Sequence, residues 1–299
     1  MNIGIFGTGH FALAIGYLIN LNKHRITFIG RDASQLRELK EKKRNSKYHS
    51  YIFENGLETK SLENYISGFD ILFYCLPSSC LQLIRYDKNI PIIFTCKGFS
   101  KDFIFNTFSN YGILSGGSYS SEIMNNIPCY MTISSNKDEL CSLVSHVIKS
   151  KQCILSFNNQ PSSIELLGIF KNILAIFCGI INELGMGKNI EAAFLSKIIK
   201  KLNKIIDFDE ASFIEPAGIG DMFLSCSSTK SRNYSFGKNL MTKKTEPDSN
   251  TLVEGFISLR NMKQNLNNDF IIDLNIIIEK IINNYSSEDI KEEILKIIY

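Results

Sequence analysis

The sequence lacks the clustered cysteines and histidines that metal sites and disulfide frameworks need. Its eight cysteines are scattered without a CxxC motif, and its four histidines are equally dispersed. No zinc site can be recognised from such spacing, and the cysteines resemble small, reduced core residues. We therefore expect a cytoplasmic protein that uses no metal.

Strong charge and long apolar runs are also missing. A net charge of +3 over 299 residues is too small to indicate nucleic-acid binding. The longest uninterrupted apolar run in the central helical stretch, Ile173 to Ile181, is too short to span a bilayer. No basic segment followed by an apolar one precedes the first predicted strand, so we expect neither a targeting segment nor a membrane span.

Strand and helix signals alternate in the first half of the chain. Strand-like runs occur at 2–6, 25–29, 69–76, 90–95, 111–114, 131–134 and 152–157. This alternation predicts an α/β fold with a doubly wound, mainly parallel sheet. Long helical patterns replace the strands after residue 158, so we predict one domain over 1–158 and a helical domain over 159–299.

A dinucleotide fingerprint follows the first predicted strand. Gly7 permits the tight turn, Gly9 lets the backbone approach a pyrophosphate, and Ala12 allows close packing of the next helix. That helix, beginning near Phe11, would point its N-terminus at the phosphates. The alternative is a glycine turn without a ligand, but the strand–turn–helix context favours a nucleotide site.

Two charged residues end the second predicted strand, where a dinucleotide normally places its adenosine ribose. Arg31 could engage a 2′-phosphate, whereas Asp32 could accept from a ribose hydroxyl. Arg31 and Asp32 together do not decide whether the cofactor is NAD or NADP, although Arg31 favours NADP.

The stretch from Ser163 to Leu184 is apolar on nearly every side, which is typical of a buried helix. Lys171 lies in its middle, beside Asn172. A buried ammonium is costly unless it is paired, and a lysine brought towards neutrality can exchange protons. The alternative is a structural lysine whose ammonium reaches the helix surface.

Several polar positions could serve an anionic substrate. Lys97 follows a strand and precedes a glycine, although an ordinary surface lysine would look the same. The loop 115–122 could form an anion-binding concavity or be merely flexible. Asp221 ends the glycine turn EPAGIGD and could orient an ammonium or accept from a substrate hydroxyl. A helix starting near Ser231 would offer phosphate donors from Ser231, Arg232 and Asn233.

The order of these motifs resembles that of bacterial NAD(P)-dependent glycerol-3-phosphate dehydrogenases, from Asn2 to about Met262. The motifs that carry the resemblance are GTGHFA, CKG, LSGGSYSSE, ELLGIFKN, AGIGD, SRNYSFG and VEG. The resemblance implies an N-terminal Rossmann domain, an all-α C-terminal domain and an active site between them. It also implies reversible reduction of dihydroxyacetone phosphate to sn-glycerol 3-phosphate, which feeds glycerophospholipid synthesis.

The resemblance also assigns roles by position. Lys171 matches the proton acceptor, and Asp221 is expected to orient it or a substrate hydroxyl. The implied substrate contacts are Lys97, Gly116, Ser118, Asp221, Ser231, Arg232 and Asn233. The implied cofactor contacts are His10, Phe11, Arg31, Lys97, Ser120, Arg232 and Glu254, in addition to the fingerprint residues Gly7, Gly9 and Ala12.

The chain departs from the family pattern at three positions in the loop 115–122. Gly117 replaces a usual proline, Tyr119 replaces a usual phenylalanine, and Ser120 replaces a usual alanine. Two other functions therefore stay open: a different two-domain lysine-dependent ketone or hydroxyacid reductase, and a nucleotide-binding paralogue without catalysis. The oligomeric state is not fixed by the sequence, so a homodimer also stays open.

Overall fold

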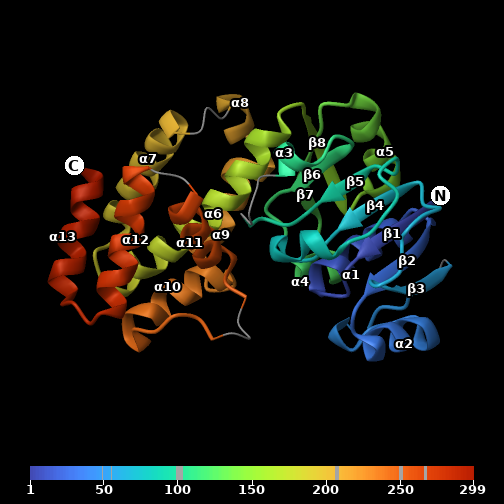
Figure 1. The fold of residues 1–299 in the computed structure, drawn as a ribbon, viewed down its shortest axis with the longest axis horizontal. Coiled ribbons are helices and arrows are strands. Elements are labelled where there is room, and N and C mark those ends of the chain that lie inside the picture. Colours follow the sequence, from blue (N-terminus) through green and yellow to red (C-terminus); the bar gives the residue numbers. More distant parts are fainter. Residues whose placement is uncertain (49, 55, 99–103, 206–208, 249–251, 266–267) are drawn as a thin grey trace.

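The computed structural model describes residues 1–299 apart from 49, 55, 99–103, 206–208, 249–251 and 266–267. The chain forms two lobes: a sheet with its helices, which holds the N-terminus, and a bundle of helices that holds the C-terminus (Figure 1). The predicted α/β fold followed by an all-α part is confirmed.

Eight strands of the described residues form one sheet in the order β3-β2-β1-β4-β5-β6-β7-β8. Every neighbouring pair is parallel except β6 and β7, which are antiparallel. The first six positions follow the strand order of a Rossmann sheet. The strands are β1 (Asn2–Phe6), β2 (Arg25–Gly30), β3 (Leu57–Ser61), β4 (Ile71–Tyr74), β5 (Ile92–Phe94), β6 (Tyr111–Ser115), β7 (Cys129–Ser134) and β8 (Cys153–Asn158).

Helices cover one face of this sheet and close the first hydrophobic core. Side chains such as Ile3, Ile5 and Phe73 pack there with α1 and α5. The helices of this lobe are α1 (His10–Leu21), α2 (Ala33–Lys42), α3 (Ile104–Thr107), α4 (Ser120–Met124) and α5 (Asp138–Ile148), with 3₁₀ turns at Ser46–Tyr48 and Ser78–Leu83. The N-terminus of α1 is thereby held at the carboxyl end of β1.

The second core runs from the opposite face of the sheet into the helical lobe, with α6 (Pro161–Glu183) at its centre. From Ser163 to Ile181 every residue of α6 is buried. Proline suits the first position of a helix, because the N–H of that position has no partner within the helix and proline lacks it. By length and composition α6 could cross a membrane, but its most apolar 18 residues are wholly buried within the fold, as in a core helix.

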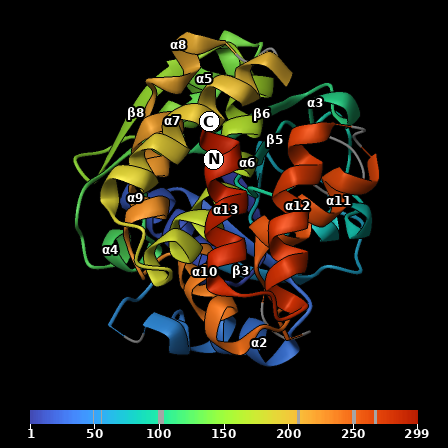
Figure 2. The same cartoon turned by 90° about the vertical axis from the view of Figure 1, so that its left-hand side faces the viewer.

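Seven further α-helices of the described residues and a π-helical turn, Pro216–Gly220, complete the helical lobe, which faces the viewer in Figure 2. The α-helices are α7 (Lys188–Ile205), α8 (Glu210–Phe213), α9 (Asp221–Ser227), α10 (Arg232–Lys243), α11 (Glu254–Asn265), α12 (Asp269–Ile282) and α13 (Ser287–Ile298). Helix α10 packs directly against α6 because each helix places a glycine, Gly179 on α6 and Gly237 on α10, against the backbone of the other. A Cβ atom at Gly237 would lie only 1.9 Å from the carbonyl oxygen of Ile176.

Candidate active site

Asp221 joins two lysine ammonium groups between the lobes. Its Oδ1 accepts a hydrogen bond from Nζ of Lys171 at 2.9 Å, and its Oδ2 accepts one from Nζ of Lys97. Lys171 also donates to Oγ of Ser225 at 2.8 Å, and Lys97 also donates to the carbonyl of Gly116 at 3.3 Å. Lys171 is therefore buried and paired rather than extended to a helix surface.

The three charged groups of this lysine–aspartate cluster, Lys97, Lys171 and Asp221, are strongly shielded from water. Their side chains are 16%, 9% and 5% exposed, respectively. Burial raises the pKa of Asp221, but the ammonium groups of Lys171 and Lys97 outweigh it and hold that pKa below its ordinary value. Burial lowers the pKa of Lys97, and Lys171 lowers it further, against the opposing effect of Asp221. The cluster as a whole carries one net positive charge, which suits an anion.

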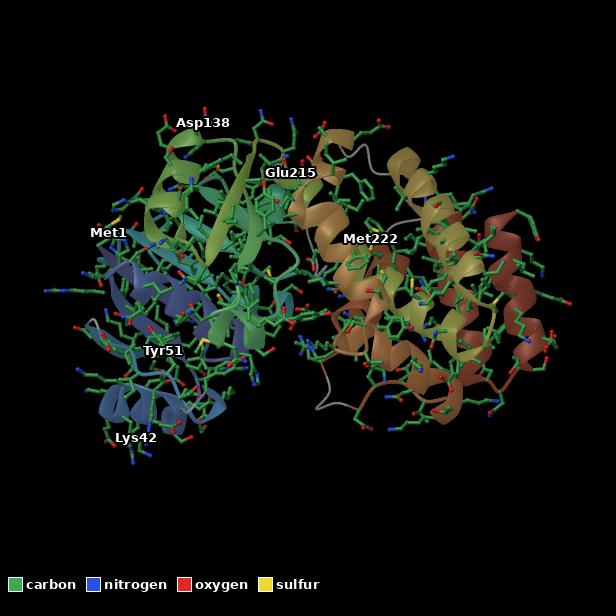
Figure 3. The ribbon with its side chains drawn as sticks, turned by 180° about the vertical axis from the view of Figure 1, so that it is seen from behind. Met1, Lys42, Tyr51, Asp138, Glu215 and Met222 are labelled. Carbon is green, nitrogen blue, oxygen red and sulfur yellow. The ribbon has the colours of Figure 1, made fainter. Side chains whose placement is uncertain are left out.

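Each member of the cluster comes from a different element. Lys171 lies in the middle of α6, Lys97 follows β5, and Asp221 opens α9 directly after a π-helical turn, Pro216–Gly220. In Figure 3, Glu215, which precedes this turn, lies where the two lobes meet, and Met222, which follows Asp221, lies in the helical lobe. Only a folded chain with both lobes in contact brings these three charges together.

Amide side chains tie the Lys97 segment to the helical lobe. The Asn172 amide donates to the carbonyl of Lys97 at 3.0 Å and accepts from Nδ2 of Asn233 at 2.9 Å. Asn233 in turn accepts from the backbone N–H of Gly255 at 3.0 Å. Both ends of the Asn233 amide are thus engaged within the protein, so its predicted substrate contact would require a shared or exchanged hydrogen bond.

The Ser231–Arg232–Asn233 triplet lies at the start of α10, as predicted from the sequence. Ser231 is the N-cap and accepts from the N–H of Tyr234, while the guanidinium of Arg232 is exposed. Free N–H groups at a helix start beside a guanidinium can bind a phosphate. Burial lowers the pKa of His10, the first residue of α1, and the positive charges of Lys47 and Arg232 lower it further.

The fingerprint turn has the backbone that a dinucleotide site needs. Gly7 has a φ of +114°, which favours glycine, and a Cβ there would lie 3.1 Å from the carbonyl oxygen of Cys75. No atom lies within 4 Å of a Cβ built on Gly9, so the backbone there is open to a ligand. Ala12 is fully buried against the sheet, and His10 begins α1. These residues fit a bound dinucleotide pyrophosphate.

Asp32 is occupied by its own helix. Its carboxylate accepts from the N–H groups of Ser34 and Gln35 and from both of their side chains, at 2.6–3.2 Å. These hydrogen bonds, led by the one from the Ser34 side chain, lower the pKa of Asp32 to about 2. The neighbouring Arg31 is exposed. If Asp32 instead bound a ribose hydroxyl, its carboxylate would have to give up some of the hydrogen bonds that cap α2.

The remaining predicted contacts surround the same region. Gly116 has a φ of +154° and leaves no room for a Cβ beside the backbone of Met131. Ser118 lies two residues on and donates to the Gly116 carbonyl at 3.3 Å, and Ser120 accepts from Tyr48 at 3.2 Å. The last two predicted contacts are Phe11, half-buried against the first core, and Glu254, the first residue of α11.

Sequence reasoning missed Ser225 and gave Asn172 no role of its own. Ser225 follows Asp221 by four residues on α9, and this spacing places both side chains on one helix face. That spacing was the available signal. The hydrogen-bond partners of the Asn172 side chain, Lys97 and Asn233, come from two other segments and leave no trace in the local sequence.

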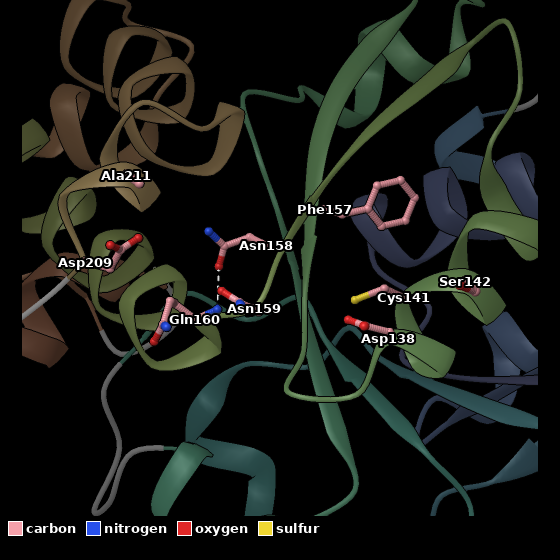
Figure 4. A pocket seen from close by; sticks show the side chains of 9 residues that line it. All are labelled: Asp138, Cys141, Ser142, Phe157, Asn158, Asn159, Gln160, Asp209 and Ala211. Carbon is pink, nitrogen blue, oxygen red and sulfur yellow. Dashed lines mark hydrogen bonds between the residues drawn. The ribbon is translucent and has the colours of Figure 1, made fainter.

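A separate surface pocket lies between α5 and the segment that joins β8 to α6 (Figure 4). Asp138 and Phe157 lie on one side of it. Asn158, whose Oδ1 accepts from the N–H of Gln160 at 2.7 Å, lies on the other. None of the predicted site residues is among those that line it, so this pocket is distinct from the lysine–aspartate cluster.

The fold and site together define a class of protein. An open fingerprint turn on a Rossmann sheet, next to a helical lobe with a buried lysine, is the arrangement of a two-domain dinucleotide-dependent oxidoreductase. Comparison with known proteins narrows this class. Residues 2–141 match the N-terminal family of NAD-dependent glycerol-3-phosphate dehydrogenases, and residues 161–292 match the C-terminal family. The chain belongs to the NAD-dependent glycerol-3-phosphate dehydrogenase family.

Individual relatives agree with this assignment. A glycerol-3-phosphate dehydrogenase (NAD(P)+) of Staphylococcus haemolyticus is 25% identical over 280 residues, which cover 85% of this chain and 84% of that protein. The crystal structure of glycerol-3-phosphate dehydrogenase from Coxiella burnetii shares the fold with a TM-score of 0.83 and 20% identity, covering 99% of this chain and 98% of that one. A 2-dehydropantoate 2-reductase fold from Enterococcus faecalis, covering 99% of both chains, reaches a TM-score of only 0.55 at 11% identity.

Proposed function

We propose that the protein catalyses the reversible NAD(P)H-dependent reduction of dihydroxyacetone phosphate to sn-glycerol 3-phosphate. The single observation that carries this proposal is the buried carboxylate of Asp221, which pairs with Lys171 and Lys97 within a member of this family. The product would supply the glycerol backbone of phospholipids. A two-domain reductase for a carboxylate substrate has less support, since such a substrate would not need the Ser231–Arg232–Asn233 triplet of α10 that we propose binds the phosphate.

Gly7, Gly9 and Ala12 would hold the cofactor pyrophosphate at the N-terminus of α1. His10, Phe11, Ser120 and Glu254 are the further proposed contacts. When bound, NAD(P)H supplies the hydride for the ketone carbon.

Lys171 is the proposed proton donor in the reductive direction and the acceptor in the reverse. Its ammonium group, fixed by Asp221 and Ser225, would donate a proton to the oxygen of the reduced carbonyl. Asp221 orients both ammonium groups, and Lys97 adds a second positive charge beside the developing oxyanion. A metal ion is not required in this scheme, because the two lysines supply the electrophilic assistance.

The substrate phosphate would lie at the start of α10. Arg232 is the proposed charge partner, assisted by Ser231, Asn233 and the N–H groups of the first turn. On the sheet side, Gly116 and Ser118 would contact the rest of the substrate. This clamp would hold the ketone carbon at a fixed distance from Lys171, which is how positioning accelerates a reaction.

A preference for NADPH over NADH is proposed for the adenosine end. Support comes from the exposed Arg31 at the end of β2 and from Asp32, whose carboxylate is occupied as a helix cap. An exposed guanidinium can bind a 2′-phosphate, whereas a capping carboxylate has less capacity for a ribose hydroxyl.

The domain division at 158/159 and a cytoplasmic location also belong to this proposal. The division is supported by β8, which ends at Asn158, and by α6, which begins at Pro161. The family relationship supports a cytoplasmic reaction between small molecules. A homodimer stays a prediction.

An absorbance assay tests the proposed reaction. Purified protein is mixed with dihydroxyacetone phosphate and with NADPH or NADH in turn, and loss of the reduced nicotinamide band is followed together with glycerol 3-phosphate formation. We expect equimolar oxidation and product, faster with NADPH at low cofactor concentration. If neither cofactor is oxidised, the proposed function is wrong and the non-catalytic paralogue is favoured.

A further inference from the structure

The π-helical turn Pro216–Gly220 determines where Asp221 points, because Asp221 is the next residue. A π-helical turn is rare and is frequently found at functional sites. Close packing limits its movement on one side, since a Cβ at Gly218 would lie 2.2 Å from the carbonyl oxygen of Phe213. The position of the turn relative to the sheet needs a separate contact.

Thr132 on β7 makes that contact. Its Oγ1 accepts a hydrogen bond from the backbone N–H of Ala217, within the turn, at 3.1 Å. It also accepts from Oγ of Ser156 on β8 at 3.0 Å. Thr132 and Ala217 are both fully buried, so water cannot replace a lost acceptor without a rearrangement.

Thr132 is linked to the other side of the lysine–aspartate cluster as well. Across the β6–β7 ladder it lies opposite Ser115, the residue before Gly116. The carbonyl of Gly116 accepts from Lys97, and the turn beyond Ala217 delivers the carboxylate that also accepts from Lys97. The two acceptors of the Lys97 ammonium, the Gly116 carbonyl and the Asp221 carboxylate, are therefore both held in place next to Thr132.

We propose that Thr132 is a positioning residue for catalysis, which holds the Pro216–Gly220 turn through the N–H of Ala217 and so fixes Asp221 between Lys97 and Lys171. It does not touch substrate or cofactor. This inference rests on the proposed function, because it needs a reaction in which the cluster takes part. Its consequence is a defect in turnover without a defect in cofactor binding.

Thr132→Val tests the inference, because valine keeps the shape and removes the acceptor. We expect kcat to fall by about 10-fold or more, the scale of a small misplacement in a catalytic group. The dissociation constant of NADPH, measured by fluorescence without substrate, should stay unchanged. Thr132→Ser retains the hydroxyl and should restore kcat to within about twofold of wild type, because the acceptor is present again.

Ser156→Ala is the matched control, since it removes the neighbouring hydroxyl but leaves the bond between Ala217 and Thr132. Its kcat should stay near that of wild type. If Thr132→Val does not fold, Thr132→Cys replaces it. Its thiol keeps a polar atom at the γ position, but sulfur is a weak acceptor, so the kcat of this variant should lie well below that of Thr132→Ser.

Normal kcat in a folded Thr132→Val or Thr132→Cys protein would overturn the inference, as would equal losses in the serine and valine variants. An inactive wild-type protein would instead refute the proposed function. The two failures are therefore distinguishable.

Discussion

Replacing Asp221 by asparagine removes the charge that two buried ammonium groups share and keeps the shape of the side chain. Lys171 at 2.9 Å and Lys97 would both lose their counter-charge while less than one-fifth of either side chain is exposed. Removing one partner of a buried pair typically destabilises a protein by about 3–5 kcal/mol. We expect Asp221→Asn to lower the free energy of unfolding by an amount in this range, measured by urea denaturation at neutral pH.

The same substitution should disable turnover. With the carboxylate gone, neither ammonium is oriented, and we expect kcat to fall by about 100-fold, as for other misplaced catalytic groups. Glu288→Gln is the control, because it removes the carboxylate of an exposed pair with Lys291 on α13. That change should alter stability by at most about 1 kcal/mol. If Asp221→Asn turned over within twofold of wild type, the catalytic role of the cluster would be refuted.

The pH dependence of stability gives a second readout of Asp221. Its pKa in the folded protein lies below the ordinary value, so the unfolded chain binds the proton more readily. The stabilisation is fully present above about pH 4, the ordinary aspartate range, and is lost as the pH falls through the lower folded pKa. Wild-type protein should lose this contribution on acidification, whereas Asp221→Asn should show a flatter profile over the same interval.

Three other predictions concern the substrate, the cofactor and the fold. Arg232→Ala should raise KM for dihydroxyacetone phosphate by about 10-fold or more, since a charge-assisted hydrogen bond contributes about 1.5–3 kcal/mol. An equal loss with a non-phosphorylated ketone would argue against the phosphate assignment. Arg31→Gln should weaken binding of NADPH but not of NADH in fluorescence titrations, and equal weakening of both would contradict the 2′-phosphate role. Gly237→Ala should destabilise the protein by about 1–3 kcal/mol through its clash with the backbone of α6, whereas Asn239→Ala on the exposed side of α10 should be nearly neutral in urea denaturation.

Local signals were sufficient for the parts of the fold that depend on local chemistry. The Gly7 turn, the strands that enter the core and the apolar helix around Lys171 each have a pattern set by backbone conformation or burial. Strand β3 was not predicted, because LETKS at the sheet edge is only partly buried and has no apolar run. The antiparallel pairing of β7 with β6 was also not predicted, since an alternation of strands and helices does not show in which direction a strand runs.

The site was predictable as a set of residues but not as a geometry. Lys97, Lys171 and Asp221 were each recognisable from their motifs, yet nothing local indicates that one carboxylate bridges both lysines. That bridge depends on the packing of β5, α6 and the π-helical turn, which lie far apart in sequence. For the same reason the amide contacts between Asn172 and Asn233, and the cap formed by Asp32, became apparent only from the folded chain.

In the proposed mechanism, Lys171 transfers the proton in the reduction of dihydroxyacetone phosphate. The most direct test of this role is a comparison of kcat for NADPH oxidation between wild type and Lys171→Ala, with NADPH binding to each measured separately. We expect unchanged NADPH binding and a kcat at least ~100-fold lower, the scale of a lost proton-transfer group. Near-normal turnover by Lys171→Ala would contradict this role.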